Sequence, residues 1–249
     1  MTNAELGQGV RAARRDLQQG VRDALLSLGR RWPAMAAAAS LLVLLMAGVL
    51  EGQAAGDGDS AREAQLRLLQ GVAFGIVLPL FAFAASRRVG GSRAQLMLMA
   101  WPRYGGNRRG YALGRQLLVV VLTGLVIGVV GLLALGLGDA TSAPGAELPL
   151  SGTNLLAVMW VGALGSASYV GGLSLAHQYG GNVGRALFLI GDWAFGSGAS
   201  LLALPWPRAH LRALLGGSAP LGLSTRDSAL YLLAFTLVCL ASYVRRVPR

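Results

Sequence analysis

The sequence contains no lysine, and all 22 of its basic residues are arginine. Standard nucleoside triphosphatases hold phosphate with a lysine in a glycine-rich loop, so the chain itself is excluded from that class. Only one cysteine, Cys239, is present, and it lies inside an apolar run. The sequence therefore has neither a disulfide framework nor a cysteine-based spacing for metal ligands.

Charged residues are also scarce, at 13% of 249 residues, whereas soluble domains carry about 25%. Hydrophobic residues make up 54% of the chain, and the mean hydropathy is +0.54. The net charge of +11 would suggest nucleic acid only if the arginines clustered on a water-soluble face. They lie instead between apolar runs, so we expect a membrane protein with lipid around it and no nucleic-acid partner.

Six apolar stretches are long enough to cross, or nearly cross, a bilayer, which takes about 17 to 25 residues each. They cover residues 34–50, 68–85, 117–137, 155–176, 186–205 and 228–244. The first begins too far from the N-terminus to be a secretory signal, so it is expected to be retained. The sequence thus predicts an all-α, polytopic fold, with residues 1–33 as an interface helix and 34–249 as a six-span transmembrane domain.

The arginines are distributed unequally over the predicted loops. Seventeen fall before the first span, in loop 87–116, at Arg185 and in the C-terminal tail, and five fall in the alternate loops. Cytoplasmic loops are enriched in basic residues, so this bias predicts that both termini are cytoplasmic, in a bacterial inner membrane.

An amphipathic helix is predicted before the first span. Leu6, Val10, Leu17 and other apolar residues recur every three or four positions, and Asp16 and several arginines fall on the remaining faces. We expect the apolar side to lie in the headgroup boundary. Packing of a solvated helix on a partner is the alternative.

The loop over residues 86–116 contains a short apolar run, 94–101, followed by Pro102 and a second basic cluster. Eight apolar residues cannot cross a bilayer, yet they are too apolar to lie free in water. This run is therefore expected to dock onto something.

The same loop resembles the one between the second and third spans of ABC-2 type transporter permeases. The matching positions are Arg87, Arg88, Gly91, Ser92, Leu96, Leu98, Pro102, Arg108, Arg109, Gly114 and Arg115. The resemblance implies a transport permease, not an enzyme, with a coupling helix over residues 94–103 that contacts a separate ATP-binding cassette subunit. The contact residues it implies are Arg93, Gln95, Leu96, Met99, Trp101, Pro102, Arg103, Arg108 and Arg109.

The resemblance further implies an exporter in which a second permease copy, or a homologous permease, faces this one. ATP and Mg²⁺ would be bound by the partner subunit, and no cofactor is expected in this chain. The competing class is a non-transport six-span scaffold, an assembly factor or a small integral membrane enzyme.

Between the fifth and sixth predicted spans, Pro207 and the pair Gly216 and Gly217 bracket a short amphipathic helix. It would lie at the outer interface or dip back into the bilayer, and a simple surface loop is the alternative. The resemblance implies a re-entrant helix here.

Asp192 is an acid inside the fifth predicted span, and such a residue is a functional candidate because an ionised group there is costly. Its partner would be Arg185 or Arg115, or it would be a structural acid bonded to a serine or tyrosine. His177 and His210 fall on opposite sides of the membrane, so we expect neither a metal site nor a catalytic constellation.

Overall fold

The computed structural model describes residues 3–29, 31–57, 68–90, 92–141 and 152–247. Every regular element in this part of the chain is a helix, which confirms the all-α class. In chain order the elements are α1 (Asn3–Leu28), α2 (Arg31–Asp57), η1 (Leu68–Val77), α4 (Leu78–Val89), α5 (Ser92–Ala100), η2 (Trp101–Tyr104), α6 (Arg108–Thr141), α7 (Gly152–Phe195), η3 (Leu201–Ala203), α8 (Pro207–Leu214), η4 (Pro220–Gly222) and α9 (Thr225–Arg246).

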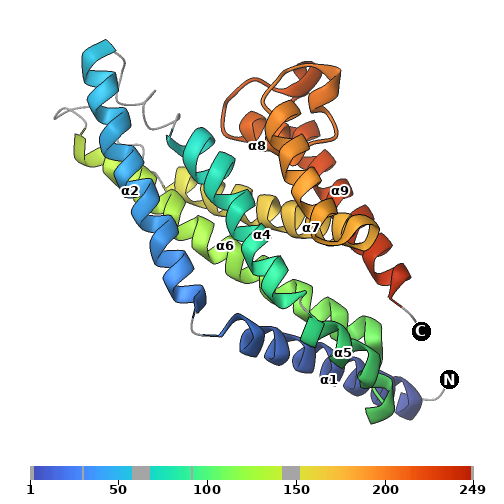
Figure 1. Cartoon of the computed structure of the whole chain (residues 1–249). Helices are drawn as coiled ribbons and strands as arrows, with labels where there is room; N and C mark the ends of the chain where they lie inside the picture. Colours follow the sequence, from blue (N-terminus) through green and yellow to red (C-terminus); the bar gives the residue numbers. More distant parts are fainter. Residues whose placement is uncertain (1–2, 30, 58–67, 91, 142–151, 248–249) are drawn as a thin grey trace.

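The helices form a bundle with two different ends (Figure 1). At the lower end, α1 lies along the first part of α6, with α5 beside them. Helix α8 lies at the upper end, between α7 and α9. The beginning of α1 and the end of α9 are both at the lower end, so the bundle starts and finishes there.

Four helical segments in the described part are long and apolar enough to cross a membrane: Leu68–Val89, Arg108–Ala134, Leu156–Phe195 and Thr225–Arg246. Trp32–Met46 in α2 is a shorter apolar helix. The predicted first span, 34–50, is helical throughout, but the side chains after Met46 lie outside the described residues.

Helix α7 is a hairpin rather than one straight rod. Its backbone is non-helical at Gly180 (φ −138°, ψ 16°) and at Gly181 (φ 58°, ψ −135°). A positive φ with this ψ is open only to glycine among ordinary residues. Beyond the break, Phe188 packs edge-on against Tyr169 and lies against Gly172. The chain therefore reverses its direction at the break, and the second half of α7 packs back against the first.

The second half of this hairpin is shorter than the sequence predicted. The fifth span was expected to reach residue 205, but the helix ends at Phe195 and the chain turns through Gly196 to Ser200. That expectation was wrong because hydropathy does not register two glycines and two serines as a helix stop. The amide of Gly196 still closes on the Asp192 carbonyl, as a helix cap does.

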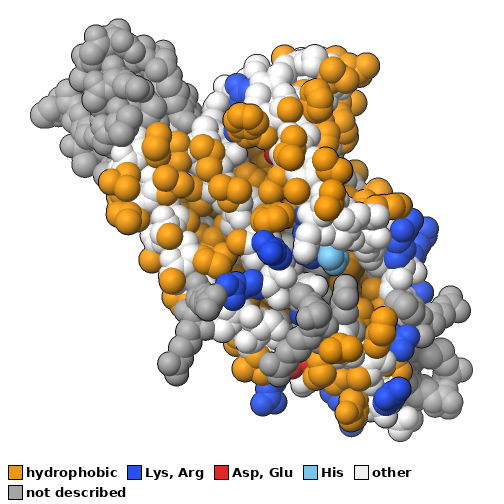
Figure 2. Space-filling view, in the orientation of Figure 1, with side chains coloured by type: hydrophobic (Ala, Val, Ile, Leu, Met, Phe, Trp, Pro, Cys, Tyr) orange, Lys and Arg blue, Asp and Glu red, His pale blue; other side chains and the backbone are white. Residues whose placement is uncertain are grey.

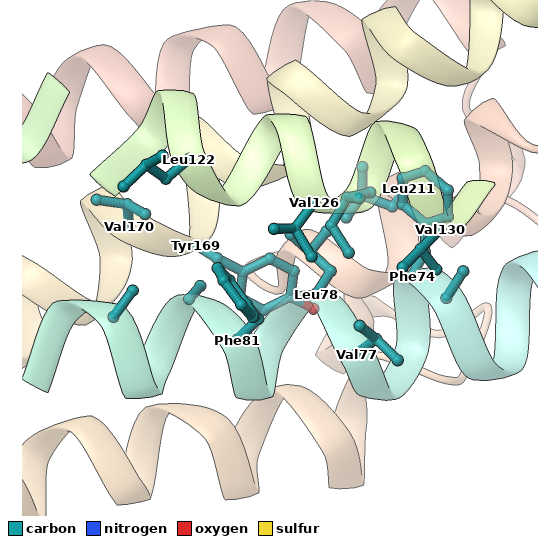
Figure 3. Close-up of a cluster of buried hydrophobic side chains, with 14 of the residues drawn as sticks. Phe74, Val77, Leu78, Phe81, Leu122, Val126, Val130, Tyr169, Val170 and Leu211 are labelled. Atoms are coloured by element: carbon teal, nitrogen blue, oxygen red, sulfur yellow. The ribbon is translucent and has the colours of Figure 1, made fainter. Parts of the chain in front are cut away.

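The core is formed by residues of η1, α4, α6, α7 and α8, shown in Figure 3. The buried side chains at its centre are Phe74, Val77, Leu78, Phe81, Leu122, Val126, Val130, Tyr169, Val170 and Leu211. Gly165 lets Leu78 and Leu211 approach the α7 backbone closely. Leu211 and His210 are buried, so α8 is part of the bundle and not a simple surface loop.

The face of the bundle shown in Figure 2 is apolar over most of its middle. On α6, Leu117, Val121, Leu125 and Val129 form an exposed stripe at a spacing of four residues. Basic side chains, all of them arginine, gather over the lower part of the face shown. A soluble protein rarely exposes so large an apolar surface, whereas a bilayer covers it at no cost.

Candidate functional site

The short apolar run of the long loop folds into two helical pieces. Helix α5 covers Ser92–Ala100, and the 3₁₀ turn η2 covers Trp101–Tyr104, with Pro102 in its first turn. Gly105 ends the turn with a φ of 69°, which directs the chain into α6. A docking helix predicted over 94–103 therefore falls on these two elements together.

The apolar side chains of α5 remain exposed in the chain. Leu96 is 69% exposed and Met99 is 64% exposed, and Met97 is also accessible. Nothing in the described chain covers them. Helix α5 lies at the same end of the bundle as α1 (Figure 1), and Arg103 of the adjoining turn η2 is also exposed.

Trp101 anchors this exposed surface to the rest of the protein. Its indole Nε1 donates a hydrogen bond to Asp16 of α1 at 3.2 Å, and its ring stacks on Tyr111 of α6 at 5.2 Å between centroids. Gly106 lies directly against the ring, which leaves no room for a side chain there. Trp101 is half-buried and contacts both α1 and α6, and its predicted contact with a partner stays a prediction.

Asp16 is the centre of this junction, and it is only 2% exposed. Besides the indole, it accepts a hydrogen bond from the backbone amide of Asn107 at 2.9 Å, and Arg15 forms an ion pair with it at 3.7 Å. The sequence pattern placed Asp16 on a polar face, and that placement was wrong. A carboxylate can be buried here because several donors surround it.

A second acid of α1, Asp23, accepts a hydrogen bond from the Tyr111 hydroxyl at 2.8 Å. Asp16 and Asp23 are two turns apart, so both acids face α6. The only signal for this in the sequence was that two acids stand seven positions apart on a basic helix. Neither residue was among the predicted contacts.

The other predicted contact residues lie around the same loop. Arg108 donates to the Met99 carbonyl at 3.1 Å, which ties the end of α5 to the start of α6. The backbone amide of Arg109 donates to the Asn107 side chain at 2.9 Å. Pro102 is exposed in η2. Arg93 and Gln95 lie on α5, but their side chains are outside the described residues.

Asp192 lies far from this surface, at the end of α7 that meets α8. It is buried and accepts hydrogen bonds from the Tyr169 hydroxyl at 2.6 Å and from the backbone amide of Arg208 at 3.0 Å. Of the alternatives open from the sequence, the acid bonded to a tyrosine is the one observed. Arg185 and Arg115, the other candidates, make their hydrogen bonds elsewhere. Because Arg208 belongs to α8, its bond to Asp192 holds α8 in the bundle.

Within the described residues, no three His, Cys, Asp or Glu side chains gather as metal ligands would. The fold and its surface together indicate a helical membrane protein with an exposed apolar surface on α5 at its arginine-rich end. Comparison of the chain with protein-family models, characterised proteins and solved structures finds no match.

Proposed function

We propose that this chain is the membrane subunit of an ATP-driven transporter of the ABC-2 type, an exporter of the bacterial cytoplasmic membrane. A separate ATP-binding cassette subunit hydrolyses ATP with Mg²⁺, and two permease chains face each other around the path. The observation that carries the proposal is the exposed surface of Leu96, Met97 and Met99 on α5, held rigidly against α1 and α6.

Six crossings of the membrane are part of this proposal. Helix α2, the segment Leu68–Val89, α6, the two halves of α7 and α9 would be the six. The hairpin at Gly180 and Gly181 supports counting α7 twice. Its second half, 182–195, extends about 21 Å at 1.5 Å per residue, which is less than the hydrocarbon layer of about 30 Å. The segment with α8 would fill the remaining depth as a re-entrant helix.

The anchoring of α5 supports a coupling role because it gives a path for motion. A partner that moves α5 would pull on Trp101, which contacts both Asp16 on α1 and Tyr111 on α6. Helix α6 then continues from the loop into the apolar bundle. Motion of a docked subunit would thus reach a membrane-spanning helix through one short, packed connection.

The chemistry of the surface indicates the partner's complementary site. Exposed leucine and methionine side chains need an apolar cleft, and the neighbouring Arg103 favours acids at its rim. Because this chain has no lysine for a phosphate-binding loop, ATP hydrolysis must be in another chain.

A cysteine cross-link tests the proposal directly. In a Cys239→Ser background the chain has no other thiol, so Met99→Cys places a single reactive group on α5. A short bifunctional thiol reagent applied to native membranes should join this variant to a protein that carries a G-x-x-x-x-G-K-[ST] loop. Arg226→Cys, an exposed position in the first turn of α9, is the matched control and should give no such product.

Two outcomes would count against the transporter. One is a Met99→Cys product that contains only copies of this chain, and the other is a product whose partner has no phosphate-binding loop. Leu96→Asp combined with Met99→Asp should remove the ATPase from the purified complex while the chain still inserts. Retention of the ATPase with full activity would show that α5 is only a connector.

A further inference from the structure

A second polar site lies at the arginine-rich end, in a cavity of about 290 Å³ between the ends of α4, α6 and α9 and the hairpin of α7. Leu98 of α5 also lines it, on the same short helix that carries the exposed Leu96 and Met99. The polar side chains that line it are Arg115, Gln116, Ser174, His177, Gln178, Arg185, Tyr243 and Arg246. Three of these are arginines, and none of the described residues lining the cavity is an acid.

Two of the arginines are deeply buried, and among the described residues neither forms an ion pair with an acidic side chain. Arg115 is 6% exposed and Arg185 is 3% exposed. Within the described part of the chain, the ion pair recorded is that of Arg15 with Asp16, on α1. Buried charges are normally paired, because removing an ion from water without compensation is costly.

Part of this charge is compensated by the end of α4. Arg115 donates to the Val89 carbonyl, and Arg185 donates to the Ser86 carbonyl at 3.3 Å. Both carbonyls belong to the last turn of α4, whose dipole provides about half a negative charge. Two guanidinium groups therefore exceed what the helix end can balance, and a net positive charge remains at the cavity.

Two residues that line the cavity also have buried nitrogen atoms without a hydrogen-bond partner. The Nε of Arg185 and the Nδ1 of His177 are buried and have no partner. Arg246 lies over the Tyr179 ring at 3.9 Å, which holds its guanidinium at the mouth of the cavity while its N–H groups keep their donor capacity. Guanidinium donors from α6, α7 and α9 thus line one volume.

We propose that this cavity binds an anionic phosphate group. A phosphate offers several acceptor oxygens, and guanidinium groups match its geometry with paired N–H donors. The group would come either from the headgroup of an anionic phospholipid or from a soluble phosphate. This inference does not rest on ATP-driven transport and would hold for any function of the chain.

The test uses the full chain purified in a zwitterionic detergent, with the thermal unfolding midpoint as the readout. The probes are inorganic phosphate, set against sodium chloride of equal ionic strength, and dihexanoyl phosphatidylglycerol, set against dihexanoyl phosphatidylcholine. A bound anion stabilises the folded state, so the midpoint should rise with the concentration of at least one anionic probe. A rise with inorganic phosphate identifies a soluble ligand, and a rise with phosphatidylglycerol alone identifies a lipid headgroup.

Arg246→Gln and Arg245→Gln form a matched pair of variants. Both positions are exposed at the end of α9, but only Arg246 lines the cavity. Arg246→Gln should weaken the apparent affinity roughly tenfold, as expected for loss of one charge-assisted contact, and Arg245→Gln should not. Arg185→Gln should weaken binding further if it folds, and the test does not depend on it.

The proposal is overturned if neither anionic probe raises the midpoint above its control. It is also overturned if Arg246→Gln and Arg245→Gln respond alike, because binding would then reflect general surface charge.

Discussion

A single buried carboxylate, Asp16, joins three segments that are far apart in the sequence. It contacts Trp101 of η2 and Asn107 at the start of α6, from its own place in the middle of α1. The placement of the exposed apolar surface of α5 therefore depends on a residue in the N-terminal helix. This dependence makes Asp16 the most informative residue to replace at this end of the protein.

Asp16→Ala should destabilise the protein by about 1–3 kcal/mol, because it leaves the half-buried indole N–H of Trp101 and the backbone amide of Asn107 without their acceptor. The melting midpoint should fall, and trypsin should cut faster at Arg103, which is exposed on η2. Asp227→Ala is the control, since Asp227 is exposed and its contacts are confined to Ser224. Equal effects of the two replacements would contradict the anchoring role.

His210 provides a pH test of how α8 is held. Its ring is buried, its Nε2 donates to the Leu204 carbonyl at 2.8 Å, and it stacks on Tyr231 at 4.0 Å. Burial lowers the pKa of His210 below the ordinary value of 6.5. The neutral ring is thus favoured in the folded state, so its contribution is complete above that pH and is lost as pH falls below it.

Thermal unfolding should accordingly show a lower midpoint near about pH 5.5 than near about pH 7.5. In His210→Phe the ring still packs on Tyr231 but cannot take up a proton, so the difference between the two pH values should shrink. The hydrogen bond to Leu204 is lost at both pH values and therefore cancels from that difference. An unchanged difference would mean that His210 does not control the pH response.

The sequence predicted the placement of some single side chains and not of others, for a physical reason. Leu96 and Met99 belong to a run that is too short to cross a membrane and too apolar to lie free in water, and from this we expected a surface for docking. The burial of Asp16 could not be predicted, because an amphipathic pattern sorts residues by polarity, whereas a carboxylate surrounded by donors is stable inside. The partner of Asp192 depended on a long-range fold that spacing does not encode.

Among the helices, α1 and α6 cross so closely that neither has room for a side chain at the crossing point. A methyl group at Gly20 would overlap the Tyr111 carbonyl, and one at Gly114 would overlap the Leu17 carbonyl. Two glycines, one from each helix, therefore bring the two backbones into contact. This close approach positions Asp16 and Asp23 against the start of α6.

Gly20→Ala should destabilise the protein by about 1–3 kcal/mol, since the helices must separate to admit the methyl group. Gly9→Ala on the same helix has no atom within 4 Å of the added group, so it should stabilise by up to about 1 kcal/mol through helix propensity. Chemical denaturation in detergent compares the two directly. If both replacements stabilise, the close crossing does not exist in the folded protein.

Helices whose ends are marked by proline or by paired glycines were predicted well, and helices without such residues at their ends were not. The start of α8 at Pro207 and its end before Gly216 and Gly217 are confirmed. The end of α7 at Phe195 was missed, because the apolar residues 201–204 follow the small residues 196–200 and keep the whole stretch apolar on average. The sharp turn at Gly180 and Gly181 has a clear glycine signal, yet only the contacts between the two halves of α7 establish it as a hairpin.

At the scale of the whole molecule, charge and apolar surface are separated along the bundle. Arginines gather at the end with α1 and α5, and apolar side chains cover the middle (Figure 2). The opposite end carries α8 and the beginning of α9, where Arg226 is exposed. Because basic residues are enriched on the cytoplasmic side of membrane proteins, this asymmetry predicts that the arginine-rich end faces the cytoplasm.

This orientation can be measured with two cysteines at opposite ends, Arg103→Cys and Arg226→Cys, each in the Cys239→Ser background. Both replace one exposed arginine, so they change the charge equally. A membrane-impermeant maleimide should label Arg226→Cys in spheroplasts, whereas Arg103→Cys should react only after the membrane is broken. The reverse pattern would place α5 outside the cell, where no ATP-binding subunit could reach it, and would remove the basis for the proposed transporter. Labelling of both in spheroplasts would mean that the chain does not separate these two ends across a membrane.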